Sequence, residues 1–183
     1  IPAEPLFRSV KNQPSLFDGA RMQLDEAIDL SLASLAAYGA QHSHWALAYS
    51  GGKDSTATAA FVSWAIRTCQ VQAPQTLTVL YADTRMELPP LQTTAMRMLA
   101  SIQEQGFDSR VVLPEMDDRF MVYMLGRGIP PPKNRFRWCT TQIKVEPMMR
   151  ALAGLREQSG EKLLMLTGVR LGESAARDQR IAL

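Results

Sequence analysis

Short apolar runs alternate with longer segments of helical periodicity along most of this chain. Four runs have the length and composition of buried strands: residues 44–49, 77–81, 110–113 and 162–166. Five segments have helical spacing or helical boundary residues: residues 20–38, 54–68, 89–105, 117–125 and 145–158. This alternation predicts an α/β fold, a three-layer parallel sheet with helices on both faces.

The pattern also sets the expected domain boundaries. Residues 1–18 contain three prolines and little periodicity, so we interpret them as an N-terminal arm. Residues 19–183 are enough for a single domain with its own core. Within that domain, residues 126–134 contain two glycines and three consecutive prolines, which predicts a rigid loop.

Composition narrows the class of protein but names no partner. Hydrophobic residues make up 46% and charged residues 21%, and the net charge of +2 does not by itself indicate nucleic acid. No apolar run is long enough to span a membrane, and the N-terminus lacks a signal-peptide pattern. Two cysteines, Cys69 and Cys139, make no disulfide framework, so we expect a cytoplasmic protein without a membrane partner.

The most informative feature is a Ser-Gly-Gly-Lys-Asp-Ser sequence between the first predicted strand and a predicted helix. Glycines allow close backbone approach, and a helix N-terminus offers unpaired N–H groups and partial positive charge. The segment therefore predicts a phosphate-binding loop formed by Ser50, Gly51, Gly52, Lys53, Asp54 and Ser55. Its adjacent glycines distinguish it from the kinase-type and dinucleotide-binding motifs. The alternative is a plain glycine turn that joins a strand to a helix.

Polar residues also follow the second predicted strand. Ligands of such sheets lie beyond the carboxyl ends of the strands, so Asp83 and Thr84 are expected beside the phosphate loop. Asp83 could accept a hydrogen bond from a ribose hydroxyl or hold Mg²⁺, or it could form a local loop turn. Glu87 precedes the next helix, where a carboxylate is favoured by the helix dipole or serves simply as a cap.

Residues 119–145 contain six basic residues and no acidic one, with Phe136 and Trp138 among them. Such a segment suits contacts with nucleic-acid phosphates and stacking on bases. The alternative is a solvated loop with one packed tryptophan. Cys139 lies near Arg137 and Lys144, and nearby cations favour a reactive thiolate. This thiol could be a nucleophile, a persulfide acceptor, a cluster ligand or an inert half-buried side chain.

Further cations follow the fourth predicted strand, after Gly168. Arg170 comes first, and Arg177 and Arg180 share a face if the segment is helical. Guanidinium groups match phosphate oxygens two at a time, so these residues could neutralise a triphosphate. The alternative is a surface helix with an i,i+4 pair between Glu173 and Arg177.

Three segments together resemble the phosphoadenosine-phosphosulfate reductase superfamily, which has an adenine-nucleotide α-hydrolase-like fold with a PP-loop. They are Ser50–Ser55, the Arg-Trp-Cys-Thr sequence at residues 137–140, and Gly-Val-Arg-x-x-Glu-Ser-x-x-Arg at residues 168–177. Residues 126–140 further resemble the DNA phosphorothioation proteins DndC and SspD. The resemblance covers about residues 40–180.

This resemblance implies an ATP pyrophosphatase that uses Mg²⁺ and adenylates a DNA backbone phosphate for sulfur insertion. It implies catalytic roles for Lys53, Asp54, Cys139 and Arg170. It implies ATP binding by the phosphate loop together with Asp83, Thr84, Gly168 and Arg170. It implies substrate or phosphate binding by Arg135, Arg137, Trp138, Lys144, Glu173, Arg177 and Arg180.

The resemblance also implies partners: DNA, a cysteine desulfurase as sulfur donor and other phosphorothioation subunits, with a homo-oligomer allowed. Proteins of the DndC type carry a four-iron cluster on four cysteines, and two cysteines do not support such a cluster here. No Cys-x-x-Cys motif occurs, and His42 and His44 are expected to face solvent, so no protein-held metal is predicted.

Two other functions stay open from the sequence. One is sulfur assimilation, by an enzyme like the small subunit of ATP-sulfate adenylyltransferase or like a reductase of the superfamily. The reductases use a C-terminal nucleophilic cysteine, and its absence counts against a thioredoxin-linked reductase. The other is a non-catalytic subunit that binds ATP for assembly or sensing.

Overall fold

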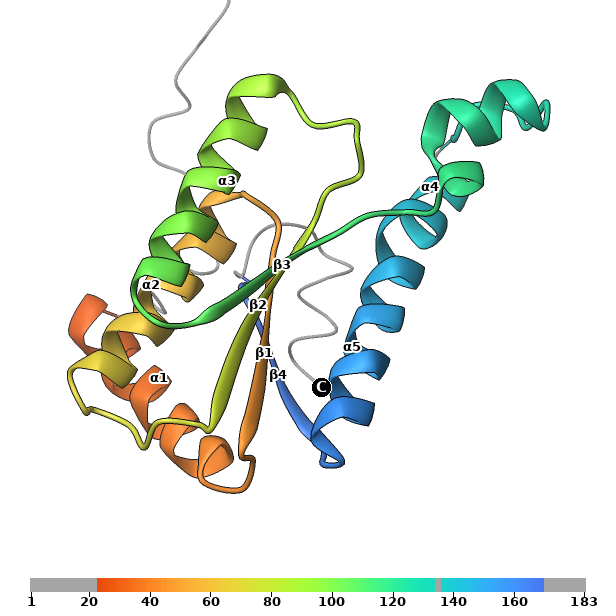
Figure 1. Cartoon of the computed structure of the whole chain (residues 1–183). Coiled ribbons are helices and arrows are strands. Elements are labelled where there is room, and N and C mark those ends of the chain that lie inside the picture. The colour runs from red at the N-terminus through yellow and green to blue at the C-terminus, as the bar shows by residue number, and fades with distance from the viewer. Residues whose placement is uncertain (1–22, 134–135, 170–183) are drawn as a thin grey trace, which may run out of the picture.

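The computed structural model describes residues 23–133 and 136–169, and Figure 1 shows a single parallel sheet at its centre. The strands are β1 (His44–Tyr49), β2 (Thr76–Ala82), β3 (Asp108–Val112) and β4 (Leu163–Thr167). Their order across the sheet is β3-β2-β1-β4, and all three neighbouring pairs are parallel. The carboxyl ends of the strands therefore lie at one edge of the sheet.

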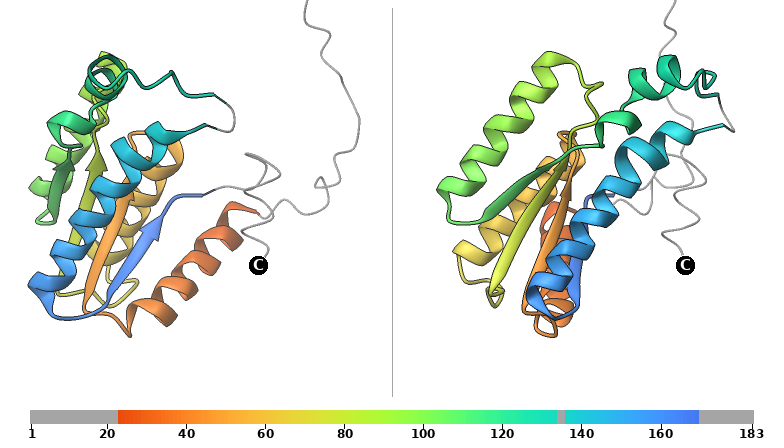
Figure 2. Two further views of the ribbon diagram at one scale, coloured as in Figure 1. Left: turned by 90° about the vertical axis from the view of Figure 1, so that its right-hand side faces the viewer. Right: turned by 45° about the vertical axis from the view of Figure 1, so that its right-hand side comes forward.

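Helices cover both faces of this sheet, as Figure 2 shows. One face carries α1 (Leu24–Gly39), α2 (Lys53–Arg67) and α3 (Pro89–Glu104), and the other carries α5 (Glu146–Ser159). The predicted three-layer α/β architecture is confirmed. The predicted single domain over residues 19–183 stays a prediction, and the predicted arm at residues 1–18 lies outside the described residues.

The two central strands are apolar because both of their faces are covered. Along β1, Trp45 and Leu47 pack toward α1–α3, whereas Ala46 packs toward α5. In β2, Val79 and Leu80 divide between the two cores in the same way. Unbroken apolar runs of this kind are typical of strands at the centre of a parallel sheet.

Gly39 is the last residue of α1, as predicted, but it does not act as a left-handed helix cap. It is not among the positive-φ glycines of the described chain. A Cβ on Gly39 would instead collide with the indole ring of Trp45, which is 1% exposed. The glycine lets the helix end lie directly on the largest buried side chain of β1.

The segment between β3 and α5 departs most from the predicted elements. We call residues 116–145 the lobe. It contains a 3₁₀ turn (Met116–Asp118), two π turns (Val122–Gly126 and Thr141–Val145) and a short α4 (Trp138–Thr140). The predicted helical segment at 117–125 is confirmed as helical, but it is divided at Arg119 into a 3₁₀ turn and a π turn.

The last helical segment also begins earlier than predicted, at Trp138 rather than residue 145. Pro147, in the first turn of α5, suggests a helix start in the sequence because its nitrogen cannot donate a hydrogen bond. The π turn that precedes it carries the helical path across this point. The lobe lies on the same side of the molecule as the carboxyl ends of the strands (Figures 1 and 2).

Candidate functional site

The predicted phosphate loop connects β1 to α2 at the carboxyl edge of the sheet. Gly51 has a φ of 75°, in the left-handed region that glycine adopts freely, and Gly52 is the N-cap of α2. Lys53 is the first residue of the helix and is exposed, and Asp54 follows it. The loop therefore presents a helix N-terminus and an ammonium group at the surface, which is the arrangement that binds anions.

Two serine hydroxyls hold the loop in this shape. The Ser55 hydroxyl accepts a hydrogen bond from the Ser50 backbone N–H at 3.2 Å and donates to the Gly52 carbonyl at 3.0 Å. It also lies 3.1 Å from the Ser50 hydroxyl, and Ser55 is only 6% exposed. Ser55 thus stabilises the loop from inside, while its predicted contact with ATP stays a prediction.

Thr56 supports the same loop, a role that the sequence motif did not predict. Its hydroxyl donates to the Gly52 carbonyl at 2.8 Å and reaches the buried Tyr49 hydroxyl at 3.4 Å. The available signal was a threonine in the first turn of a helix, four residues after the N-cap, where its hydroxyl can bond back to the backbone.

Gly168 brings the end of β4 against the phosphate loop. A Cβ on Gly168 would lie 2.6 Å from the Thr58 hydroxyl oxygen and 2.7 Å from the Asp54 carbonyl oxygen. The hydroxyl of Thr58 itself donates to that carbonyl at 2.9 Å. Only a glycine permits this approach, so the structure brings Gly168 and the loop together as the sequence predicted.

Asp83, after β2, is buried and bonded within its own loop. Its carboxylate accepts from the Arg85 backbone N–H at 2.9 Å and from the Gln92 amide at 3.1 Å, and it is 3% exposed. The first of these bonds is the local Asx turn that the sequence offered as an alternative. Thr84 donates its hydroxyl to Glu87 at 2.7 Å. Contacts of Asp83 and Thr84 with adenosine or Mg²⁺ stay predictions.

Tyr81 lies beneath these two loops. Its ring is 5.8 Å from that of Tyr49, and both rings are almost fully buried. Burial, followed by the nearby carboxylates Glu87 and Asp83 and by Tyr49, raises the pKa of Tyr81 to about 12. The phenol therefore stays neutral under the site at physiological pH.

The lobe is organised around Trp138. Its ring stacks on Phe120 with centroids 5.3 Å apart and contacts Tyr123 at 4.8 Å. Its indole N–H donates to the Pro130 carbonyl at 3.1 Å, which fixes the proline-rich loop. The Arg127 guanidinium lies over the Tyr123 ring at 4.9 Å. The structure thus shows the packed tryptophan that the sequence offered as the alternative. Stacking of Trp138 on a base stays a prediction.

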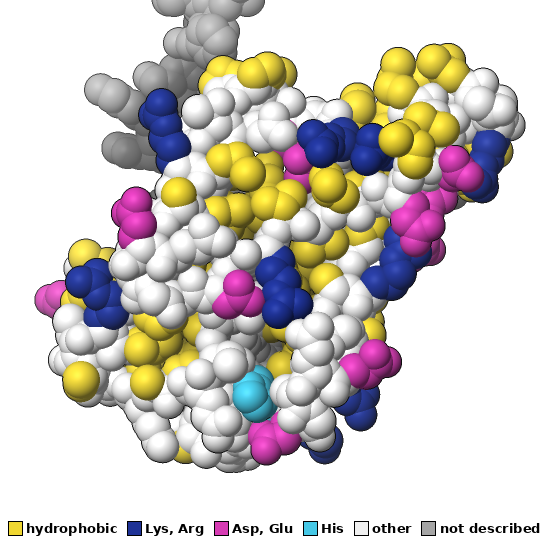
Figure 3. Space-filling view, in the orientation of Figure 1, with side chains coloured by type: hydrophobic (Ala, Val, Ile, Leu, Met, Phe, Trp, Pro, Cys, Tyr) yellow, Lys and Arg dark blue, Asp and Glu magenta, His cyan; other side chains and the backbone are white. Residues whose placement is uncertain are grey.

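Exposed cations and apolar side chains share the surface of the lobe. Arg127, Lys133, Arg137 and Lys144 are all exposed. Phe136 is 47% and Leu125 71% exposed, and Figure 3 shows cations beside apolar side chains on this part of the molecule. Cys139 is half-buried in α4, whereas Cys69 is exposed at the end of α2. The position of Cys69 after an apolar helix predicts a structural, buried thiol, and its exposure shows that this prediction is wrong as to burial.

Several predicted site residues lie outside the described residues: Arg135, Arg170, Glu173, Arg177 and Arg180. Over residues 23–133 and 136–169, no group of three or more His, Cys, Asp or Glu side chains is arranged to hold a metal ion. In that same part of the chain, every helix is too short or too polar to cross a bilayer.

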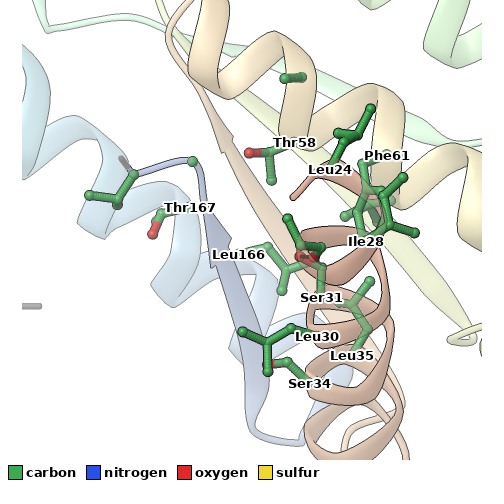
Figure 4. A pocket seen from close by; sticks show the side chains of 15 residues that line it. Leu24, Ile28, Leu30, Ser31, Ser34, Leu35, Thr58, Phe61, Leu166 and Thr167 are labelled. Atoms are coloured by element: carbon green, nitrogen blue, oxygen red, sulfur yellow. Dashed lines mark hydrogen bonds between the residues drawn. The ribbon is translucent and has the colours of Figure 1, made fainter. Parts of the chain in front are cut away.

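One hollow among the described residues does not coincide with the phosphate loop. It has a volume of about 770 Å³ and lies between α1, α2 and the end of β4, as Figure 4 shows. Its lining is mainly apolar, with Leu24, Ile28, Phe61 and Leu166, and it shares only Gly168 with the predicted ATP-binding residues. An apolar hollow of this kind does not suit a triphosphate.

A parallel sheet with a glycine turn and a helix N-terminus at its carboxyl edge is typical of α/β nucleotide-binding proteins. A comparison with family models gives the family itself. Residues 44–182 match the phosphoadenosine phosphosulfate reductase domain, and the chain belongs to this family. The family binds adenine nucleotides, and its members are typically enzymes of sulfur chemistry. A comparison with curated proteins gives no match.

Proposed function

We propose that this protein is an ATP pyrophosphatase that adenylates a phosphate of the DNA backbone for sulfur insertion, as in DNA phosphorothioate modification. Family membership supports the chemistry of adenine nucleotides and sulfur. The observation that carries the proposal is the phosphate loop, with Gly51 at a φ of 75° and Lys53 exposed at the start of α2. The resemblance of residues 126–140 to DndC and SspD supports DNA as the acceptor.

In the proposed reaction a non-bridging oxygen of the DNA phosphate attacks the α-phosphorus of ATP. The bond from the α-phosphorus to the α–β bridging oxygen breaks, and pyrophosphate leaves. A sulfur nucleophile then attacks the DNA phosphorus and displaces AMP; where this nucleophile is a cysteine persulfide, a thiol reductant then cleaves the S–S bond and frees the phosphorothioate. Lys53 and the N–H groups of α2 would stabilise the charge that develops on the leaving phosphates.

Mg²⁺ is the metal that this proposal requires. It is usually held by substrate phosphates and one or two carboxylates rather than by an all-protein cage. Asp54 and Asp83 are the carboxylates nearest to the loop in sequence and along the sheet edge. When bound, the ion would neutralise phosphate charge.

The lobe supports the choice of a polyanionic acceptor. It lies on the side of the molecule that carries the phosphate loop (Figure 1). Residues 119–145 include exposed cations and no acid in their sequence, while Asp117 and Asp118 lie at the start of the lobe. Such a surface binds phosphates by releasing counterions. Since Trp138 is packed within the lobe, exposed Phe136 is the better candidate for stacking on a base.

The sulfur donor in this proposal is a cysteine desulfurase, with other phosphorothioation subunits as partners in the cytoplasm. Cys139 lies in α4 within the lobe and would accept or align the sulfur, although it is half-buried. The proposal allows a homo-oligomer. A four-iron cluster is not part of it, because the chain has two cysteines and the described residues hold them on separate elements.

The test is product analysis of the purified protein with ATP and Mg²⁺, with and without DNA. The expected result is AMP and pyrophosphate, increased by DNA and lost in Lys53→Ala. ADP and phosphate would contradict the proposed bond cleavage. Pyrophosphate release with sulfate, accompanied by adenosine phosphosulfate instead of AMP, would favour sulfur assimilation, as would formation of sulfite from phosphoadenosine phosphosulfate and a thiol reductant; the family match supports this as the second candidate. ATP binding without any product would favour an assembly subunit.

A further inference from the structure

We propose that Arg85 binds a phosphate oxygen of the nucleotide held at the phosphate loop. This inference rests on the nucleotide-binding part of the proposed function and not on DNA as the acceptor. It adds a residue that neither the sequence motifs nor the family resemblance singled out. Three observations carry it: the backbone conformation of Arg85, its place at the edge of the sheet, and the loose engagement of its guanidinium.

The backbone of Arg85 is in the left-handed region, with a φ of 62°. Over the described residues, Cys69 is the other non-glycine with a positive φ, at 56°. A residue with a Cβ pays roughly 1–2 kcal/mol for this conformation, which glycine adopts without cost. An arginine in such a position is unfavourable for the fold, which suggests that its side chain has a use.

Arg85 stands three residues after the end of β2, the strand that pairs with the one leading into the phosphate loop. Tyr81 of β2 pairs with Tyr49 of β1, the residue that precedes the loop. A Cβ on Gly51 would lie 3.8 Å from the ring of Tyr81, so the loop leans toward β2. The chain that leaves β2 therefore begins next to the phosphate-binding backbone.

The guanidinium of Arg85 is loosely held. Its side chain is 48% exposed, and its Nε lies 3.7 Å from the Asp83 carboxylate, which is beyond hydrogen-bond distance. Asp83 takes its two hydrogen bonds from the Arg85 backbone and Gln92 instead. Within the described residues, the contact of the Arg85 guanidinium is this ion pair with Asp83. The N–H donors of the guanidinium are therefore available to a phosphate.

The chain supplies a matched control for the test. Arg85→Gly removes both the cation and the energetic cost of the left-handed backbone conformation. Cys69→Gly removes only such a cost, at the far end of α2. Both variants should unfold at a temperature equal to or above that of the wild-type protein. Arg85→Lys keeps a cation and should lose less ligand affinity than Arg85→Gly.

The measurements are the thermal midpoint and the Kd values for ATP, inorganic pyrophosphate and adenosine, by calorimetry on the full chain. Arg85→Gly should weaken ATP and pyrophosphate at least tenfold and change adenosine less than twofold, while Cys69→Gly changes none of them. Unchanged ATP affinity, an equal loss for adenosine, or a wild-type protein that binds neither ATP nor pyrophosphate would overturn the inference. A fall in the thermal midpoint of Arg85→Gly would show instead that Arg85 has a structural role as the partner of Asp83, and would also overturn the inference.

The same experiment separates this inference from the proposed function. If the wild-type protein binds ATP through Arg85 and forms no AMP, the proposed function fails and the role of Arg85 stands. If AMP and pyrophosphate form as proposed and Arg85→Gly binds ATP normally, the role of Arg85 fails and the proposed function stands.

Discussion

A methyl group on Gly168 should disturb both the fold and the phosphate loop. In Gly168→Ala the new Cβ would lie 2.7 Å from the Asp54 carbonyl oxygen and 2.6 Å from the Thr58 hydroxyl oxygen. Ordinary contact begins near 3.4 Å, so the end of β4 and the first turn of α2 must separate by about 0.7 Å at the carbonyl. The backbone carbonyl cannot swing aside as a side chain can, because it belongs to the helix.

The expected destabilisation is about 1–3 kcal/mol, the usual cost of forcing extra volume into a packed contact. For a chain of this size that lowers the thermal midpoint by about 2–4 °C per kcal/mol. Since Asp54 and Lys53 share the displaced turn, ATP affinity should also fall, by about tenfold if one charge-assisted phosphate contact is lost.

The assay is urea unfolding together with calorimetric titration of ATP. Gly154→Ala is the matched control, because Gly154 lies within α5 and nothing lies within 4 Å of its added Cβ. That variant should gain about 0.5–1 kcal/mol and bind ATP normally. A Gly168→Ala protein as stable as Gly154→Ala, with unchanged ATP affinity, would refute the close approach of β4 to the loop.

Three further predictions follow from the site. Lys53→Ala should reduce ATP cleavage by about 10²–10³-fold, as expected for lost transition-state stabilisation, and pyrophosphate release measures this; activity within tenfold of wild type would contradict it. Because the pKa of Tyr81 is raised from 10.0 to about 12, its contribution to stability is full below pH 10 and is lost between pH 10 and 12. Tyr81→Phe should flatten that part of the pH dependence in urea unfolding, and exposed Tyr38→Phe should not. Replacing Lys133 and Arg135 by alanine should lower the log–log salt slope of DNA binding by a little under one unit per lost phosphate contact, with ATP affinity unchanged; an unchanged slope would mean that DNA binds elsewhere.

The two central strands of the sheet were predictable because they are apolar on both faces. The predicted strand at residues 44–49 has the observed bounds, because its apolar run is short and the Gly-Gly turn follows it directly. The lobe was less predictable. One π turn directly precedes α5, whose first turn contains Pro147, and the other follows Phe120, which stacks on Trp138; neither feature leaves a periodic signal in the sequence.

The phosphate loop was predictable because its chemistry is local. Six consecutive residues carry the glycine turn, the helix start and the cation, so spacing alone indicates the site. Gly168 was found through family resemblance, but its contact with Asp54 and Thr58 joins positions more than a hundred residues apart. Arg85 had no motif, and its positive φ becomes visible only in the folded backbone.

The contact between Gly168 and the loop links nucleotide binding to the integrity of the sheet. β4 pairs only with β1 within the described chain, and its end is one of the walls of the loop. A nucleotide that needs the loop in its native position therefore binds the state in which β4 is docked. By mass action such a ligand stabilises that state by about 2.7 kcal/mol at one hundred times its Kd. The strand at the edge of the sheet, not the central strand that carries the motif, is thus the element whose docking nucleotide binding should stabilise most.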